Sequence, residues 1–168
     1  LEGRVTTLHP TIHGGILARR DVPSHISQLQ QNGIDEIDVV VVNLYPFVDT
    51  VSKPHVEFSE ALENIDIGGP TMIRSAAKNF RDVVVVVDPS DYEWVGRKLV
   101  LGNGLTELEK KTLAQKAFQH VAHYDTAISS WLRDSSVLSA KVVTTGYEKL
   151  SDLRYGENPH QKAAVYKG

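Results

Sequence analysis

One short stretch of the chain combines residue types that can perform acid–base chemistry. Asp66, the pair Gly68 and Gly69, and Lys78 lie within 13 positions. A carboxylate and a lysine can act as base and acid, and glycines let the backbone turn sharply and approach a ligand closely. Pro70 suits the first turn of a helix, so we expect a short helix whose free N–H groups face a ligand above the glycines. The alternative is a tight loop followed by an ordinary surface lysine.

Two polar residues follow a hydrophobic run that predicts a strand over 37–42. Asn43 can offer an amide to a base or a carboxamide, and Tyr45 can offer a hydroxyl and an aromatic ring. Ligands of open parallel sheets bind beyond the carboxyl ends of the strands. These two residues are therefore candidates for a binding site; the alternative is a turn with a half-buried tyrosine.

A polar cluster, Arg4, Thr6 and Thr7, precedes the helix predicted over 10–20. An arginine, hydroxyl groups and free backbone N–H groups are what a phosphate monoester needs. The cluster is therefore a candidate phosphate site, and the alternative is a solvated tail.

The elements that must position these residues alternate between strand and helix. Two β-branched runs, 37–42 and 82–88, predict strands that are buried on both faces, as in a parallel sheet. More than 30 residues with helical patterning separate them, which is the length of a crossover connection. Further helices are predicted over 24–32, 56–64, 91–100 and 106–133, the last opened by a capping box at Thr106 and Glu109. The predicted class is α/β with a mostly parallel sheet.

Composition excludes several classes of function. The net charge of −3 provides no basic footprint, so nucleic acid is not an expected partner, and no apolar run has membrane-spanning length. Without cysteine there is no thiolate metal site. The histidine pairs His9/His13 and His120/His123 lack an apparent third ligand, so no metal is expected.

Four blocks in a fixed order identify a family resemblance. Residues 3–20, 43–47 and 65–79 closely resemble the IMP cyclohydrolase domain of the bifunctional AICAR transformylase/IMP cyclohydrolase family. Residues 153–161 resemble the opening of that family's transformylase domain. The resemblance covers essentially the whole chain and is weakest over 134–150, where a linker is expected.

The resemblance implies an α/β, methylglyoxal-synthase-like (Rossmann-like) three-layer domain with a parallel sheet. It implies an IMP cyclohydrolase domain over 1–133, N-terminally truncated, a linker over 134–150, and the start of a transformylase domain over 151–168. The chain begins with Leu1, and its one methionine is Met72, which also suggests a fragment.

The implied activity belongs to de novo purine biosynthesis. It is the dehydrative ring closure of formyl-AICAR to IMP, in a parent that also carries AICAR formyltransferase activity. In this reaction Asp66 is expected to accept a proton or orient the amide, and Lys78 to act as the acid. Tyr45 and the N–H groups near Ile67 and Gly68 are expected to stabilise the developing charge.

The resemblance also implies a set of substrate-binding residues, which comprises Arg4, Val5, Thr6, Thr7, Val42, Asn43, Ile67, Gly68, Arg154 and Tyr155. The last two match an Arg-Tyr pair of the transformylase site, and without the rest of that site they are remnants. Thr6 departs from the family pattern, which usually has lysine at this position. The change removes a positive charge beside an anionic ligand and points to reduced activity or to another cation taking its place.

The resemblance further implies no cofactor for the cyclohydrolase and 10-formyltetrahydrofolate as co-substrate of the parent's transformylase. It implies a homodimeric parent whose small-molecule partner is a purine ribotide, and the composition fits a cytoplasmic protein. Two alternatives remain: a non-catalytic purine-ribotide-binding module of the same fold, and an inactive fragment. The isolated chain is expected to have neither transformylase activity nor appreciable ring-closing activity.

Overall fold

The computed structural model describes residues 4–102, 104–133 and 140–168. The chain divides into two compact units, one over 1–121 and the other over 122–168. Within the described ranges, no helix combines the length and the apolar composition needed to cross a bilayer.

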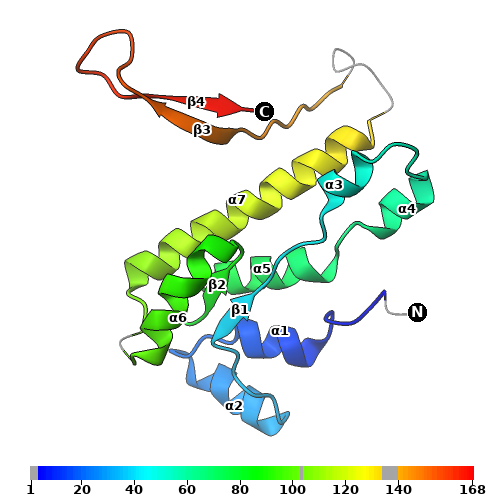
Figure 1. Ribbon diagram of the computed structural model, residues 1–168. Coiled ribbons are helices and arrows are strands. Elements are labelled where there is room, and N and C mark those ends of the chain that lie inside the picture. Colours follow the sequence, from blue (N-terminus) through cyan, green and yellow to red (C-terminus); the bar gives the residue numbers. More distant parts are fainter. Residues whose placement is uncertain (1–3, 103, 134–139) are drawn as a thin grey trace. The chain divides into compact units, whose positions relative to one another are not determined.

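The first unit alternates helices with two short strands (Figure 1). Its elements are α1 (Pro10–Leu17), α2 (Pro23–Gln31), β1 (Val39–Val41), α3 (Phe47–Val51), α4 (Phe58–Glu63), α5 (Gly68–Lys78), β2 (Val84–Val86), the 3-10 turn η1 (Pro89–Asp91), α6 (Tyr92–Val100) and most of α7 (Glu107–Trp131).

The two strands form a parallel pair, as the sequence predicts. Val39 pairs with Val84 and Val41 with Val86. The crossover between the strands contains α3, α4 and α5. The helix predicted over 56–64 is shorter, and α3 was not predicted.

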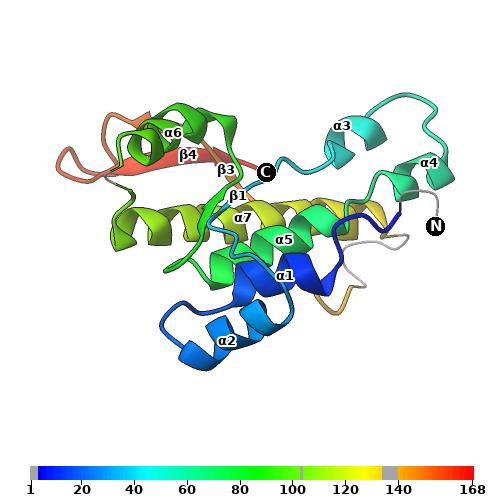
Figure 2. The same cartoon turned by 90° about the horizontal axis from the view of Figure 1, so that it is seen from below.

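Helices cover both faces of β2, which confirms that this strand is buried on both sides. Val83 and Val85 belong to a core cluster that includes Ile73 of α5 and residues of α1 and α7. Val84, which points to the opposite face, packs in a second cluster with Val95 of α6. Figure 2 shows α1 lying alongside α5 beneath the strands. The result is the expected three-layer arrangement.

The prediction that the first strand is also buried on both faces is wrong. Val40 is 6% exposed, whereas Val39 and Val41 are 37% and 52% exposed. The helix α6 packs on the Val84 face of β2 and leaves the corresponding face of β1 open. That open face ends at Val41, which borders a pocket.

The end of α1 differs from the prediction for an identifiable reason. The helix stops at Leu17, and Ala18 is extended. The buried amide of Asn79 donates to the carbonyls of Ile16 and Ala18, at 2.9 and 3.1 Å. Asn79 therefore satisfies the open carbonyls at the C-terminus of α1, which local sequence could not reveal.

The capping box of α7 forms as predicted. The Thr106 N–H donates to Glu109 Oε2 at 2.8 Å, and the Glu109 N–H donates to Thr106 Oγ1 at 3.3 Å. The neighbouring Lys98 ammonium, together with the N–H and the hydroxyl of Thr106, lowers the pKa of Glu109 to about 2. The long helix begins at Glu107 and ends at Trp131, near the predicted bounds.

The second unit contains a hairpin that the sequence did not predict. Its strands, β3 (Glu148–Leu153) and β4 (Ala163–Lys167), are antiparallel. All residues of β3 are exposed, so the strand lacks the alternation of apolar and polar residues that usually marks one. Part of the predicted linker, 134–139, lies outside the described residues, and β3 begins inside the remainder.

Candidate functional site

The start of α5 is fixed by the carboxylate of Asp66. Asp66 Oδ1 accepts the N–H of Gly69 at 2.8 Å, which caps the helix. A Cβ on Gly69 would lie 2.5 Å from Asp66 Oδ2 and 2.8 Å from Leu44 Cδ2. Only glycine therefore lets the carboxylate fold back onto the helix start.

Gly68 brings a second segment to the same place. A Cβ on Gly68 would lie 2.3 Å from Thr7 Oγ1, so the absent side chain is what allows this hydroxyl to rest against the first turn of α5. The structure thus joins the predicted phosphate cluster to the predicted acid–base motif.

The residues after β1 reach the same region. The Asn43 side chain donates from Nδ2 to the carbonyl of Val87 at 3.1 Å, which ties the ends of the two strands together. Tyr45 is 57% exposed. As expected for parallel strands, both residues lie beyond the carboxyl end of β1.

Arg4 lies in the same region and forms an ion pair with Glu63. Its Nε lies 3.3 Å from Glu63 Oε2, and both side chains are exposed. Sequence analysis missed Glu63, because a glutamate on an amphipathic helix normally faces solvent. No signal in the local pattern distinguishes it from Glu60.

These segments enclose one pocket of about 510 Å³, which we call the site pocket. Nine of the predicted site residues line it: Arg4, Thr6, Thr7, Val42, Asn43, Tyr45, Asp66, Ile67 and Gly68. The other lining residues are Val41, Leu62, Glu63, Ile65, Gly69 and Met72. Hydroxyls, an amide, two carboxylates and an arginine beside a helix N-terminus suit a polar ligand that carries an anionic group.

Four predicted residues do not line the site pocket. Val5 is 52% exposed beside it. Arg154 and Tyr155 follow β3 in the hairpin of the second unit and are exposed. Lys78 lies at the opposite end of α5 from Asp66. The 11 residues of this helix rise about 16 Å, so the Lys78 ammonium is not brought to the carboxylate within one copy of the chain.

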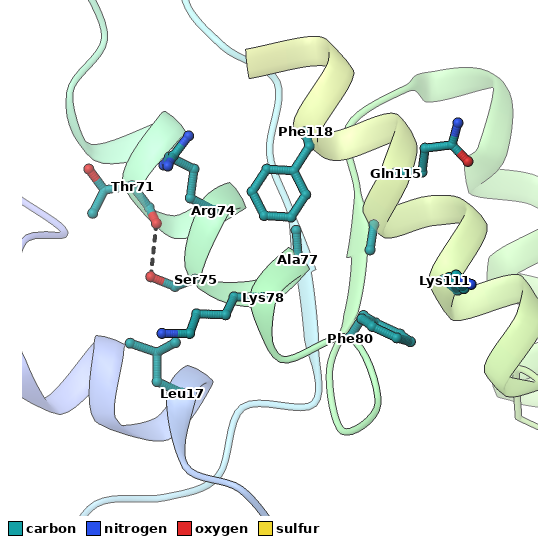
Figure 3. Close-up of a pocket in the computed structure, with 11 residues that line it drawn as sticks. Leu17, Thr71, Arg74, Ser75, Ala77, Lys78, Phe80, Lys111, Gln115 and Phe118 are labelled. Carbon is teal, nitrogen blue, oxygen red and sulfur yellow. Dashed lines mark hydrogen bonds between the residues drawn. The ribbon is translucent and has the colours of Figure 1, made fainter. Parts of the chain in front are cut away.

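Lys78 instead lines a second hollow of about 740 Å³, which we call the helix groove (Figure 3). Its walls are α5 and α7, with Leu17 of α1 beside Lys78. It also contains Arg74 and Lys111, and the Arg74 guanidinium lies 5.9 Å from the centre of the Phe118 ring.

Two of the histidines singled out in the sequence, His9 and His13, have hydrogen-bond partners. His9 Nδ1 accepts the N–H of Thr11 at 3.2 Å and so caps α1. His13 Nδ1 lies 3.1 Å from Ser75 Oγ. Among the residues that the structure describes, no three histidine, aspartate or glutamate side chains gather as metal ligands.

Asp88, directly after β2, is the other notable carboxylate near the strand ends. Lys116 Nζ lies 2.6 Å from Asp88 Oδ2, and the Ser90 N–H donates to Oδ1 at 2.8 Å. The Lys116 ammonium and these Ser90 bonds lower the pKa of Asp88 to about 2. Asp88 is not part of the site pocket lining; together with Asp91 it ties η1 to Lys116 of α7.

Two family models together match most of this chain. Residues 1–71 match the family model of the MGS-like domain, and residues 76–168 match that of the AICARFT/IMPCHase bienzyme. The bifunctional purine biosynthesis protein PurH of Bacillus mycoides (strain KBAB4) is 56% identical over 99% of this chain. The protein of the same name from Bacillus cereus (strain B4264) is 55% identical over the same share.

The chain spans about a third (33%) of the length of these curated relatives. A solved structure titled "Crystal structure of ForH" is 38% identical, with a TM-score of 0.68, and the match covers 77% of this chain and 66% of that chain. The MGS-like match and this likeness confirm the predicted α/β fold class. The chain therefore belongs to the AICARFT/IMPCHase bienzyme family.

Proposed function

We propose that the site pocket binds a purine ribotide and that, in the whole protein, it closes the second ring of the purine by converting formyl-AICAR to IMP. One observation carries the proposal. Three segments far apart in the sequence, 4–7, 42–45 and 66–68, contribute nine predicted residues to a single pocket. The names of the relatives, which are purine biosynthesis proteins, support the same reaction.

In this reaction the protein mainly has to position the substrate and stabilise the charge that develops. A carboxamide nitrogen attacks a formyl carbon of the same molecule, so the enzyme must hold both groups in an attack geometry. Asp66 keeps Oδ1 on the Gly69 N–H, and we assign to its carboxylate the role of accepting the amide proton or orienting the amide. Tyr45 and the N–H groups at the start of α5, near Ile67 and Gly68, stabilise the developing oxyanion.

The 5′-phosphate is assigned to the N-terminal cluster. Thr7 lies against the start of α5, and Arg4 is close enough to the pocket to line it. To bind the phosphate, the Arg4 guanidinium must first break its ion pair with Glu63. Because this ion pair is exposed, its loss costs less than about 1 kcal/mol. A phosphate dianion then replaces one carboxylate as partner of the guanidinium.

The role of Lys78 as acid stays a prediction. Its ammonium lies in the helix groove, so it can protonate the leaving oxygen only if a second copy of the chain brings its own Lys78 to the site pocket. A homodimeric parent, which the family resemblance implies, offers such a route.

The formyl-transfer step of the bienzyme is assigned to the whole protein, with 10-formyltetrahydrofolate as the formyl donor. Arg154 and Tyr155 are its proposed contribution from this chain. Ring closure itself requires no cofactor or metal in this proposal, and we place the protein in the cytoplasm.

A second candidate function is ribotide binding without turnover. The neutral Thr6 favours it, since it stands where the family usually has a lysine. Arg4 is the one cationic residue among those that line the site pocket in the described structure. A pocket with reduced positive charge can retain a ligand and still lack the electrostatic stabilisation that the reaction needs.

One experiment separates the two functions. A chimera, in which this chain replaces the matching third of the Bacillus mycoides relative, is incubated with formyl-AICAR while IMP is followed by absorbance. The isolated chain is titrated with IMP by calorimetry in parallel. Turnover by the chimera supports the cyclohydrolase proposal, and IMP binding without turnover supports the second candidate. If neither turnover nor binding is seen, both candidate functions are contradicted.

A further inference from the structure

The amide of Asn43 is held in one orientation, although the residue is exposed. Nδ2 donates to the carbonyl of Val87 at 3.1 Å, and Oδ1 accepts a hydrogen bond from the hydroxyl of Tyr92. A backbone carbonyl can only accept, so it selects the NH₂ side of the amide. The tyrosine hydroxyl then meets the oxygen. An exposed asparagine without these two partners would sample both flips.

Tyr92 is well placed to act through Asn43 rather than on a ligand. It is the first residue of α6 and does not line the site pocket. Asn43 does line it. After its two hydrogen bonds, the amide still has one N–H and one lone pair of Oδ1 available. These form a donor and an acceptor side by side, in an order that Tyr92 helps to fix.

We propose that Tyr92 is a positioning residue that makes the site pocket selective for one order of donor and acceptor on the purine edge. A 6-oxopurine presents a carbonyl beside an N–H, whereas a 6-aminopurine presents an NH₂ beside a bare ring nitrogen. The order of hydrogen-bond donor and acceptor is therefore reversed between the two edges. A freely flipping asparagine accepts both, and an asparagine with a fixed amide rejects one because its remaining N–H would face a donor and its lone pair an acceptor. This inference rests on the proposed ribotide site.

The test uses the isolated chain and compares IMP with AMP by calorimetry. Tyr92→Phe removes the hydroxyl and keeps the ring. It is expected to weaken IMP binding about 3- to 10-fold, the effect of losing one hydrogen bond, and to strengthen AMP binding, because the released amide can now flip to match the 6-amino edge. Tyr147→Phe, at an exposed tyrosine of the second unit, is the matched control and should leave both affinities unchanged.

A double-mutant cycle shows whether the effect passes through Asn43. In the Asn43→Ala background, Tyr92→Phe should no longer change the ratio of the two affinities. An equal loss for IMP and AMP, or a loss that persists without Asn43, would mean that Tyr92 only supports the fold and would overturn the proposal.

A ligand-free measurement separates this inference from the proposed function. In ¹⁵N-labelled chain, the side-chain NH₂ signals of Asn43 should be shifted from random-coil positions and should collapse toward them in Tyr92→Phe. If neither nucleotide binds the wild-type chain, the ribotide site is wrong whatever these signals do. If the ribotide binds and the Asn43 signals do not respond, the positioning role is wrong.

Discussion

The helix α5 borders two hollows of opposite character, and each is built in a different way. The site pocket surrounds its first turn and is made by backbone turns, by two glycines that admit close contacts, and by polar side chains from three segments. The helix groove runs along its flank and continues to its last residue, Lys78. Thr71, Arg74, Ser75 and Lys78 line that flank at the three- and four-residue spacing of one helix face.

The difference teaches how far proximity in sequence can mislead. Asp66 and Lys78 belong to one motif, yet the helix between them sends them to different hollows. Thr7 and Gly68 are far apart in sequence, yet they are in contact. Substitutions can test whether the two hollows act separately within one copy of the chain.

The largest effect is expected from Asp66→Asn in the chimera. The amide can still accept the Gly69 N–H, so the helix start is retained, but it cannot take a proton from the substrate. Ring closure should fall ~10²–10⁴-fold, while the affinity for IMP stays close to wild type. The measurement is turnover by absorbance, with calorimetry for binding. Turnover at the wild-type rate would remove Asp66 from the mechanism.

Lys78→Met supplies the contrast in the binding measurement. If the two hollows are separate within one copy, IMP affinity of the isolated chain should be unchanged by this substitution.

A gain is expected from Thr6→Lys. The new ammonium would lie at the site pocket, where phosphate is proposed to bind, and is expected to strengthen IMP binding by ~1–3 kcal/mol. Calorimetry at several salt concentrations checks the result, since an electrostatic gain shrinks as salt rises. An affinity that stays flat or falls at every ionic strength would show that residues 4–7 do not hold the phosphate.

Gly68→Ala tests the close approach of Thr7. The added Cβ would meet Thr7 Oγ1 at 2.3 Å, so the threonine must move, and IMP affinity should fall about 10-fold, the cost of roughly one hydrogen bond. Gly96→Ala is the matched control, because a Cβ there meets nothing within 4 Å and lies inside α6. The control should bind IMP normally and melt at an equal or higher temperature. Equal binding by both variants would contradict the proposed packing.

The smallest effect concerns Asp88 and its dependence on pH. Because the folded pKa is lowered from 3.8 to about 2, the Asp88 carboxylate stabilises the fold above pH 4, and this contribution is lost as pH falls toward 2. Lys116→Met removes the main cause of that shift. Both side chains are 38% exposed, so water screens the pair and the loss at pH 7 should be about 1 kcal/mol or less. Urea unfolding should show the gap between wild type and variant closing between pH 4 and pH 2, and a gap that widens there would contradict the assignment.

Sequence patterns predicted the parts of this molecule that local chemistry determines. The capping box at Thr106 and Glu109 and the parallel pairing of β1 with β2 are confirmed. The open face of β1 was not predicted, since it depends on where α6 packs, and a run of valines is the same in either case. The C-terminus of α1 was missed because its cap, Asn79, comes from more than 60 positions away.

The candidate site also contains residues that the sequence predicted and others that only the fold reveals. Family motifs pointed to the residues of the site pocket individually, and the fold brings nine of them together. Glu63 could not be found, because its importance arises only when the fold places Arg4 beside it. The hairpin was missed because its first strand, Glu-Lys-Leu-Ser-Asp-Leu, is exposed throughout and has no apolar face for a pattern to reveal.

The most direct test of the central claim is an NMR titration of the ¹⁵N-labelled chain with IMP. The account predicts that the largest shifts of backbone N–H signals fall on Thr7, Asn43 and Gly68 of the site pocket, while Lys111 and Gln115 of the helix groove stay unchanged. Largest shifts on the groove residues, with the site pocket silent, would contradict it and would move the ribotide to the other side of α5.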